Sequence, residues 1–287
     1  MRIYIVSHKQ KMKSNNMTKC ELHSENATLC ESHIIPKFVY TWMKETGTER
    51  LRQEYRLNMP LQDGIKKYML CNDCELEFSK YEKWFNENVF LPYLKDSTTK
   101  VANQFELKYF IVSVLWRIVR LFKDDGNQYK FKNNLDKAEL EWRQFLLKQN
   151  SLNNFQNHHF ILIANDYFMT KKSEIYFSRA VDIDIAENDK LCFVYAKFSR
   201  FILIGEIVGF PDNSFENTNI KTELEFSNAN QQINLSNILD FLNDRAINIK
   251  DYNDLSEKQK SKNDEYFRNK MDDLKSKEYY KIIKKYS

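Results

Sequence analysis

Residues 19–38, KCELHSENATLCESHIIPKF, bring cysteine and histidine together near the start of the chain. One pair of metal-binding residues stands in this stretch, Cys20 and His23, and a second pair follows in CNDC, Cys71 and Cys74. Two intervening residues let a tight turn point both donors of a pair at one ion, and structural zinc takes four such donors. The two complementary pairs therefore predict one closed structural zinc site.

The bulk composition predicts a cytoplasmic protein with no membrane association. The chain begins with the short apolar run MRIYIV and then becomes polar, without the long apolar core and cleavage site of a secretory leader. Its longest apolar run, YFIVSVLWRIVRLF, contains Arg117 and Arg120 and is too short and too charged to span a membrane easily.

The cysteines also fit this location. In a reducing compartment, five cysteines indicate metal ligands or free thiols rather than disulfides. Cys30 competes for the zinc site, because Cys20 and Cys30 could serve together if His23 points away. Cys192 lies in an expected strand and is assigned to the core.

Helical and strand patterns follow one another in blocks, which predicts an α+β fold. A helix is expected to begin at Pro36, in PKFVYTWMKETG, and Gly47 can end it. The run ELEFSKYEKWFNENVF has an apolar stripe typical of a second helix, which Pro92 stops. Residues 102–123 form the strongest helix, apolar nearly all round and therefore buried, and NNLDKAELEWRQFLLKQ predicts a further amphipathic helix.

From HHFILIAN onward the apolar period changes to that of strands. EIYFSRAVDIDI, LCFVYAKFS and RFILIGEIVGF are rich in Ile, Val, Phe and Tyr and are separated by polar turns. We expect residues 155–210 to form a small antiparallel sheet and the last 60 residues to be helical. His158 and His159 begin this region, and nothing near them in the sequence completes a site.

The composition divides the chain into three parts. Residues 1–95 would form the zinc-binding domain, residues 96–150 a helical segment, and residues 151–287 an α+β C-terminal domain. The boundary near residue 150 rests on KQNSLNNFQN, whose polar composition is typical of a linker.

The order of the motifs, C-x-x-H, then SHIIP, then LCNDC-E, resembles the zinc-containing HNH endonucleases, or ββα-metal nucleases. The usual pattern of that family is a C-x-x-C pair, then an acidic residue and His before Ile-x-Pro, then LC-x-x-CH at the start of a helix. The chain resembles bacterial proteins of this HNH-like kind that carry SHIIPKF and LCxxCE and are often found among anti-phage or mobile-element genes. The match covers about residues 19–90.

The resemblance implies a zinc-stabilised ββα unit of the treble-clef or HNH-like kind at the N-terminus. The helical middle, the small antiparallel sheet and the helical C-terminus would follow it. His33 would be the general base that activates water for attack on a DNA phosphodiester. A single Mg²⁺ or Mn²⁺ ion would stabilise the growing charge on the phosphate, and the four zinc ligands would only hold the scaffold together.

This sequence departs from the family pattern at both expected ligands of the catalytic cation. Ser32 replaces the acidic residue before the base, and a hydroxyl is a poor metal ligand. Glu75 replaces the histidine after the last cysteine, and its carboxylate could still bind Mg²⁺ or Mn²⁺. Glu77 and Glu82 could assist it, or all three glutamates could be a solvated helix face, since Glu is favourable near a helix N-terminus.

The Asn that usually orients the base also has no clear match. The interval between His33 and Cys71 is longer than usual for the family. We expect it to contain an inserted helix. Three polar residues in that interval are candidates for orienting His33: Asn58, Gln62 and Asp63.

Basic residues in the same interval are candidate phosphate contacts. Lys and Arg supply the sequence-independent part of DNA affinity, and the net charge of +4 permits nucleic acid as a partner without requiring it. The same cluster could be an ordinary surface. The candidates are Arg50, Arg52, Arg56, Lys66 and Lys67.

Other functions remain open at this point. His33 could simply cap its strand and donate to a backbone carbonyl, which would leave a non-catalytic zinc module that binds nucleic acid or protein. The zinc unit could also be a staple in a regulatory subunit that works in a larger complex, with residues 100–287 as the working part. A metal-dependent nuclease explains the motif order best.

Overall fold

The computed structural model describes most of the chain, and every structural statement below concerns the described residues. Arg56, one of the candidate phosphate contacts, lies outside them. The described ranges are 2–5, 18–53, 57–97, 100–101, 104–123, 128–164, 170–220, 226–227, 230–250 and 252–286.

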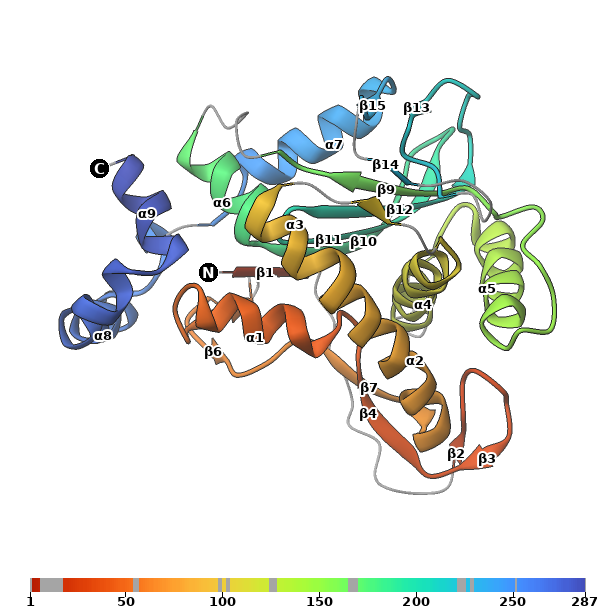
Figure 1. The fold of residues 1–287 in the computed structure, drawn as a ribbon, viewed down its shortest axis with the longest axis horizontal. Helices are drawn as coiled ribbons and strands as arrows, with labels where there is room; N and C mark the ends of the chain where they lie inside the picture. Colours follow the sequence, from red (N-terminus) through yellow and green to blue (C-terminus); the bar gives the residue numbers. More distant parts are fainter. Residues whose placement is uncertain are drawn as a thin grey trace.

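A seven-stranded sheet forms the centre of the structure (Figure 1). Its strands are β1 (Arg2–Ile5), β5 (Leu51–Gln53), β6 (Pro60–Leu61), β9 (His158–Leu162), β10 (Val181–Glu187), β11 (Cys192–Phe198) and β12 (Phe201–Val208). The order across the sheet is β6-β5-β1-β10-β11-β12-β9. β1 pairs parallel with β10 and with β5, and the other neighbours pair antiparallel.

The antiparallel part of this sheet, β9 to β12, lies within the range expected from the sequence. The sheet is larger than expected because β1, β5 and β6 extend it from the N-terminal part of the chain. Those strands are only two to four residues long, and such short runs carry little alternating pattern.

Part of the expected strand EIYFSRAVDIDI is instead a helix, α6 (Lys171–Arg179). The Thr170 hydroxyl accepts the Ser173 N–H, and the Ser173 hydroxyl accepts the Thr170 N–H, so the first turn is capped from both sides. Tyr176 and Arg179 are buried one turn apart. The strand prediction was wrong up to Arg179, and β10 begins at Val181.

Helices cover both faces of the sheet. Successive side chains of a strand point to opposite faces. Val181 and Ile183 of β10 face a core that includes α4 (Gln104–Lys123), whose burial confirms the sequence prediction. Ile204 of β12 faces a second core that includes α7 (Ser236–Ile247).

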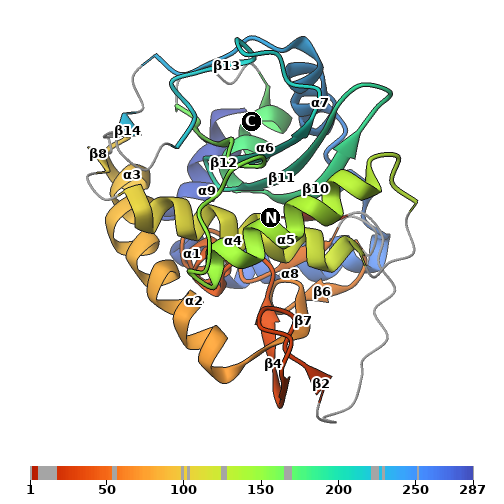
Figure 2. The same cartoon turned by 90° about the vertical axis from the view of Figure 1, so that its right-hand side faces the viewer.

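The N-terminal part forms a projecting ribbon and helix (Figures 1 and 2). β4 (Leu29–His33) pairs antiparallel with β7 (Lys66–Cys71), and α2 (Asn72–Phe85) begins directly after β7. β2 (Thr18–Lys19) and β3 (Asn26–Ala27) form a hairpin beside them, and α1 (Lys37–Glu45) follows β4. The expected helix after Pro36 is thereby confirmed.

Pro92 does not end the helical run, contrary to the sequence prediction. α2 passes through a wide turn at Asn86–Phe90 into α3 (Leu91–Asp96). The backbone stays helical through Phe90 and Leu91, so Pro92 lies inside a continuous helical run, directly after this wide turn.

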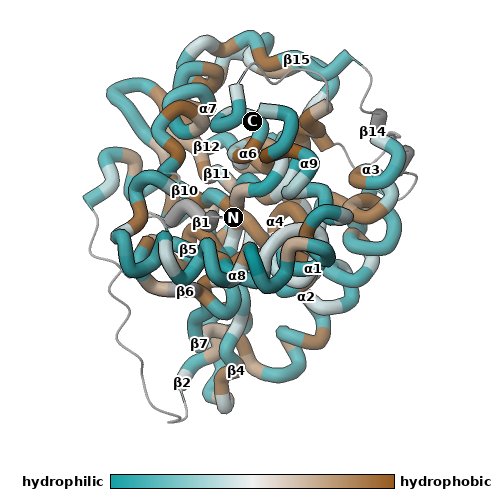
Figure 3. Tube along the Cα trace, turned by 90° about the vertical axis from the view of Figure 1, so that its left-hand side faces the viewer, coloured by the Kyte–Doolittle hydropathy of each residue, from teal (hydrophilic) through white to brown (hydrophobic). Residues whose placement is uncertain are grey.

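The remaining elements are helices and short strand pairs. α8 (Glu257–Lys275) crosses beside β5, β6 and α1 as a hydrophilic helix, which confirms a helical C-terminus (Figure 3). The elements are α5 (Lys132–Leu146), α8 (Glu257–Lys275), α9 (Glu278–Lys285), a 3-10 turn (Tyr252–Asp254), β8 (Lys100–Val101) paired with β14 (Phe226–Ser227), and β13 (Phe215–Glu216) paired with β15 (Gln232–Ile233).

One apolar core crosses the boundaries expected at residues 95 and 150. It joins Cys20, from the first of the two predicted metal-binding pairs, Trp116 of α4 and Phe201 of β12. The division into three parts stays a prediction. The structure is α+β, and none of the helices in its described part is long and apolar enough to cross a membrane.

Candidate functional site

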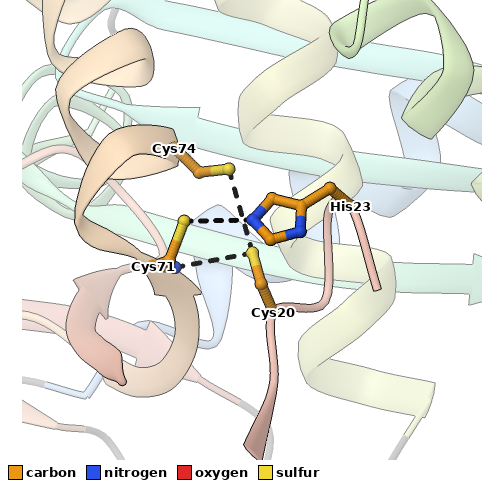
Figure 4. Close-up of side chains that lie close together, drawn as sticks. All are labelled: Cys20, His23, Cys71 and Cys74. Atoms are coloured by element: carbon orange, nitrogen blue, oxygen red, sulfur yellow. Dashed lines mark hydrogen bonds between the residues drawn. The ribbon is translucent and has the colours of Figure 1, made fainter. Parts of the chain in front are cut away.

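The two pairs predicted to bind zinc come together in the structure (Figure 4). One donor atom from each of Cys20, His23, Cys71 and Cys74 lies within 4.8 Å of the others, and we call these four residues the metal group. The Sγ atoms of Cys20 and Cys74 are 3.8 Å apart. Zinc–sulfur bonds of about 2.3 Å in a tetrahedron separate two sulfurs by about 3.8 Å. The metal group could therefore hold a metal ion, and its three thiols and one imidazole suit structural zinc.

The fold builds the metal group from two turns. Cys20 and His23 stand in the turn between β2 and β3, and Ser24 closes that turn with a positive φ of 66°. Cys71 ends β7 and Cys74 stands in the first turn of α2. The Cys71 N–H donates to the Cys20 sulfur at 3.4 Å, so the two turns already contact each other through a metal-binding atom.

Two thiols of the metal group, those of Cys20 and Cys74, have pKa values shifted in opposite directions. The hydrogen bond between Cys20 and Cys74 lowers the pKa of Cys20, although burial acts against it. The same hydrogen bond, together with burial, raises the pKa of Cys74. A thiolate is the form of cysteine that binds metal. The group therefore favours a thiolate at Cys20, which a cation would stabilise further.

Cys30 does not belong to the metal group. It is a partly exposed free thiol on β4, opposite Leu70 of β7. His23 contributes its Nε2 atom, which lies 3.2 Å from the Cys71 sulfur. The alternative pairing of Cys20 with Cys30 is thus not needed, and Cys192 lies buried in β11 as expected.

Ion pairs dock the metal group onto the helical middle. Glu21, between the first two ligands, accepts from Arg120 of α4 at 2.8 Å and pairs with Lys67 of β7 at 2.9 Å. Arg143 of α5 donates to the Ser24 hydroxyl at 3.0 Å. The turn that carries Cys20 and His23 is held by helices that lie far away in the sequence.

His33 is the last residue of β4, and its ring is held by Asp63. The distance from His33 Nε2 to Asp63 Oδ2 is 3.0 Å, and the two side chains are only 16% and 23% exposed. Burial raises the pKa of Asp63, but the hydrogen bonds from His33 and the Gly64 N–H and the charge of Lys66 lower it further than burial raises it. An ionised Asp63 accepts the Nε2 proton and leaves Nδ1 as the acceptor of the ring.

Of the three candidates for orienting His33, the structure selects Asp63. The Asn58 side chain accepts instead from the Ser256 N–H at 2.9 Å. The backbone carbonyl of Gln62 accepts from Lys44. The sequence placed all three residues in the right interval but could not rank them.

Gly64 keeps Asp63 in place because only glycine fits there. A Cβ atom on Gly64 would overlap the ring of Tyr40, which is buried. Gly64→Ala is therefore expected to destabilise the protein by about 1–3 kcal/mol, the usual cost of overpacking. It should also move Asp63 away from His33. Urea unfolding measures the first effect, and a free energy of unfolding equal to that of the wild type would contradict this packing.

The three glutamates of α2 have different surroundings. Glu77 pairs with Lys80 and Lys148, both at 2.6 Å. Glu82 pairs with Arg117 at 2.8 Å, and burial raises the pKa of Glu82 against the effect of that charge. The charge of Glu75 also raises the pKa of Glu82, in the same direction as burial.

Two side-chain oxygen atoms, one on β4 and one on α2, are buried without a hydrogen-bond partner. They are the Ser32 hydroxyl, on the residue before His33, and Oε1 of Glu75, in the first turn of α2. Buried polar atoms are nearly always satisfied, by protein, water or an ion. These two residues are the ones that the sequence pattern aligned with ligands of a catalytic cation.

Most of the candidate phosphate contacts are occupied by protein partners. Arg52 is 3% exposed and bonds Gln259 and Asn263 of α8. Arg50 also bonds Asn263 and lies over the Tyr266 ring. Lys66 pairs with Glu31 and Asp63 at 3.5 Å, and Lys67 pairs with Glu21 at 2.9 Å. The nucleic-acid contacts stay predictions.

One polar network was missed in the sequence. His159 contacts the Thr218 hydroxyl through Nδ1 and Glu206 through Nε2, both at 2.8 Å, so partners for this histidine do exist. They lie 59 and 47 residues away, and no local pattern could have indicated them. His159 is 4% exposed and Thr218 is fully buried, which places the network in the interior.

The chain was also compared with known proteins. No protein-family model matches it, and the comparisons with curated proteins and with solved structures gave no match either. The resemblance to HNH endonucleases therefore rests on the residues of the motifs alone.

Proposed function

We propose that the protein is a metal-dependent nuclease of the HNH-like, ββα-metal kind that acts on DNA phosphodiesters. The observation that carries this proposal is the position of His33. It ends a strand of the β4–β7 ribbon, its ring is fixed by Asp63, and α2 follows the ribbon with Glu75 in its first turn. A candidate base and a candidate cation ligand thus belong to one ribbon–helix unit.

Zinc in the metal group would have a structural role. Its four ligands join the β2–β3 turn to the start of α2, and all four protein positions are filled, as in closed structural sites. Cys74 and Glu75 are neighbours, so zinc binding would also fix the start of the helix that carries the cation ligand.

His33 would act as the general base. The Asp63 carboxylate would accept a hydrogen bond from Nε2–H of His33. The Nδ1 atom would then accept a proton from a water molecule. The negative charge of Asp63 would stabilise the imidazolium that forms. A general base of this kind typically contributes a factor of about 10²–10⁴ to the rate.

Two unpartnered oxygen donors of β4 and α2 would suit a hard divalent cation. Glu75 Oε1 and the Ser32 hydroxyl are oxygen atoms without partners, and Mg²⁺ and Mn²⁺ prefer oxygen ligands. When bound, such an ion supplies charge stabilisation to the phosphate and the leaving oxygen. Ser32 is a weaker ligand than the usual carboxylate, so Glu75 would supply most of the affinity.

A non-catalytic zinc module is the second candidate. Ser32 in place of an acidic residue favours it, because fewer charged ligands are left for a cation. Such a module would bind DNA, or a protein partner in a complex, without cutting. In either case the family resemblance suggests a role in anti-phage defence or in a mobile element, in the cytoplasm.

Cleavage of supercoiled plasmid separates the two candidates. The zinc-loaded wild type is expected to nick the plasmid with Mg²⁺ or Mn²⁺, and His33→Ala should lose that activity. Glu77→Gln is the matched control, because Glu77 lies on the same helix but pairs with Lys80 and Lys148. Plasmid binding without cleavage by any of these proteins would support the binding module instead.

A further inference from the structure

Arg117 of α4 contacts the His33 site from outside the ribbon–helix unit. It is 1% exposed, although the sequence shows it only as an interruption of an apolar run. Its Nη1 atom donates to the His33 carbonyl at 2.7 Å and pairs with Glu82 Oε1 at 2.8 Å. Its Nε donates to the Ser113 carbonyl at 3.1 Å, and its guanidinium carbon lies 5.4 Å from the centre of the Phe78 ring.

The burial of this guanidinium is costly. Its Nη2 atom is buried without a hydrogen-bond partner, and an unsatisfied charged donor costs more than the ~1–3 kcal/mol of a neutral one. A methionine or leucine would fill the same space in an apolar helix without that cost. The three bonds that Arg117 does make therefore indicate the structural role of its charge.

We infer that Arg117 is a positioning residue for His33, an inference that rests on the nuclease proposed above. One nitrogen atom binds both the backbone of His33 and the carboxylate of Glu82, so the end of β4 is fixed against α2. Asp63 fixes the ring of the same histidine through Nε2. The backbone and the ring of His33 are then held by two different residues. A general base needs such fixed orientation in order to accept a proton from one particular water molecule.

Through Arg117, α4 becomes part of the site around His33. Arg120, one turn after Arg117, holds Glu21 beside the metal group. The same helix therefore anchors both the zinc-binding turn and the strand that carries His33. An arginine is required at position 117, because lysine keeps the charge but loses the planar fork that spans several acceptors.

The test compares Arg117→Lys and Arg117→Ala with Arg179→Lys. Arg179 is an equally buried arginine that bonds the Met43 carbonyl and Thr46, at a different place in the fold, and so controls for general destabilisation. Three properties are measured at one pH: zinc content, the NMR signals of the His33 ring, and kcat and KM for plasmid cleavage. Millimolar guanidinium is then added to each variant.

Both Arg117 variants are expected to keep their zinc and to shift the His33 ring signals. Their kcat should fall on the order of 10- to 100-fold with little change in KM, because misplacement of a catalytic group affects the chemical step. Guanidinium should restore part of the activity of Arg117→Ala only. Arg179→Lys should leave the ring signals and kcat as in the wild type.

Two results would overturn the inference. One is His33 ring signals and kcat in the Arg117 variants that equal those of Arg179→Lys. The other is a loss of activity with unshifted ring signals and no rescue. If the wild type does not cleave at all, the nuclease proposal fails, and the ring signals alone still decide whether Arg117 positions His33.

Discussion

Cys74→Ser is expected to abolish tight zinc binding and to destabilise the N-terminal part of the protein more than any other single substitution considered above. Structural zinc binds zinc-finger peptides with an apparent free energy of about 10–16 kcal/mol, and that energy is folding energy. Removing one of four ligands should therefore cost at least about 4 kcal/mol. The turn from Cys20 to His23 has only Leu22 as a further buried apolar side chain, so packing cannot replace the metal.

Cys30→Ser is the matched control for this prediction. Cys30 is a cysteine on the adjacent strand but lies outside the metal group. Elemental analysis should find one zinc per chain in the wild type and in Cys30→Ser, and much less in Cys74→Ser. A strong chelator should lower the melting temperature of the first two proteins toward that of the third. Equal zinc loss in both variants would show that Cys30 is a ligand.

Asp63→Asn is expected to reduce plasmid cleavage on the order of 10²- to 10⁴-fold, the full contribution of a general base. The amide can still accept the Nε2 proton of His33, but it has no charge to stabilise the imidazolium. It can also turn its NH₂ group toward the ring and reverse the tautomer. Fold and zinc content should be unchanged, because Asp63 is partly exposed and lies outside the metal group.

Glu31→Gln controls for the loss of a negative charge near the site. Glu31 and Asp63 both pair with Lys66 at 3.5 Å, but only Asp63 bonds His33. The initial rate of plasmid nicking at saturating Mn²⁺ is compared for the two variants. Rates that fall equally in both would mean that charge near Lys66 matters and that orientation of His33 by Asp63 does not.

The four residues of the metal group could be predicted because each pair has a characteristic short spacing in the sequence. Cys20 with His23 and Cys71 with Cys74 are each separated by two residues, so chemistry and geometry are visible in the sequence. Asp63 stands 30 residues after His33. Sequence distance alone gave it no advantage over Asn58 and Gln62, and only the folded loop shows which of them reaches the ring.

Arg117 was beyond prediction for another reason. In the sequence it looked like a charge that prevents a membrane span, and its meaning depends on β4 packing beside α4. The sheet shows the same limit. β9 to β12 have long alternating runs, whereas the joining of β1 to β10 and of β5 to β1 depends on pairing between strands about 180 and about 50 residues apart.

Binding of Mn²⁺ to the zinc-loaded protein tests the central claim most directly. Electron paramagnetic resonance of Mn²⁺ counts bound ions without requiring a substrate, a trigger or a partner. We predict one bound Mn²⁺ per zinc-loaded chain in the wild type and in Glu77→Gln, and loss of that ion in Glu75→Gln. A protein that holds zinc but binds no Mn²⁺, or that binds it equally with Glu75→Gln, would contradict the nuclease account and leave a zinc-stabilised binding module.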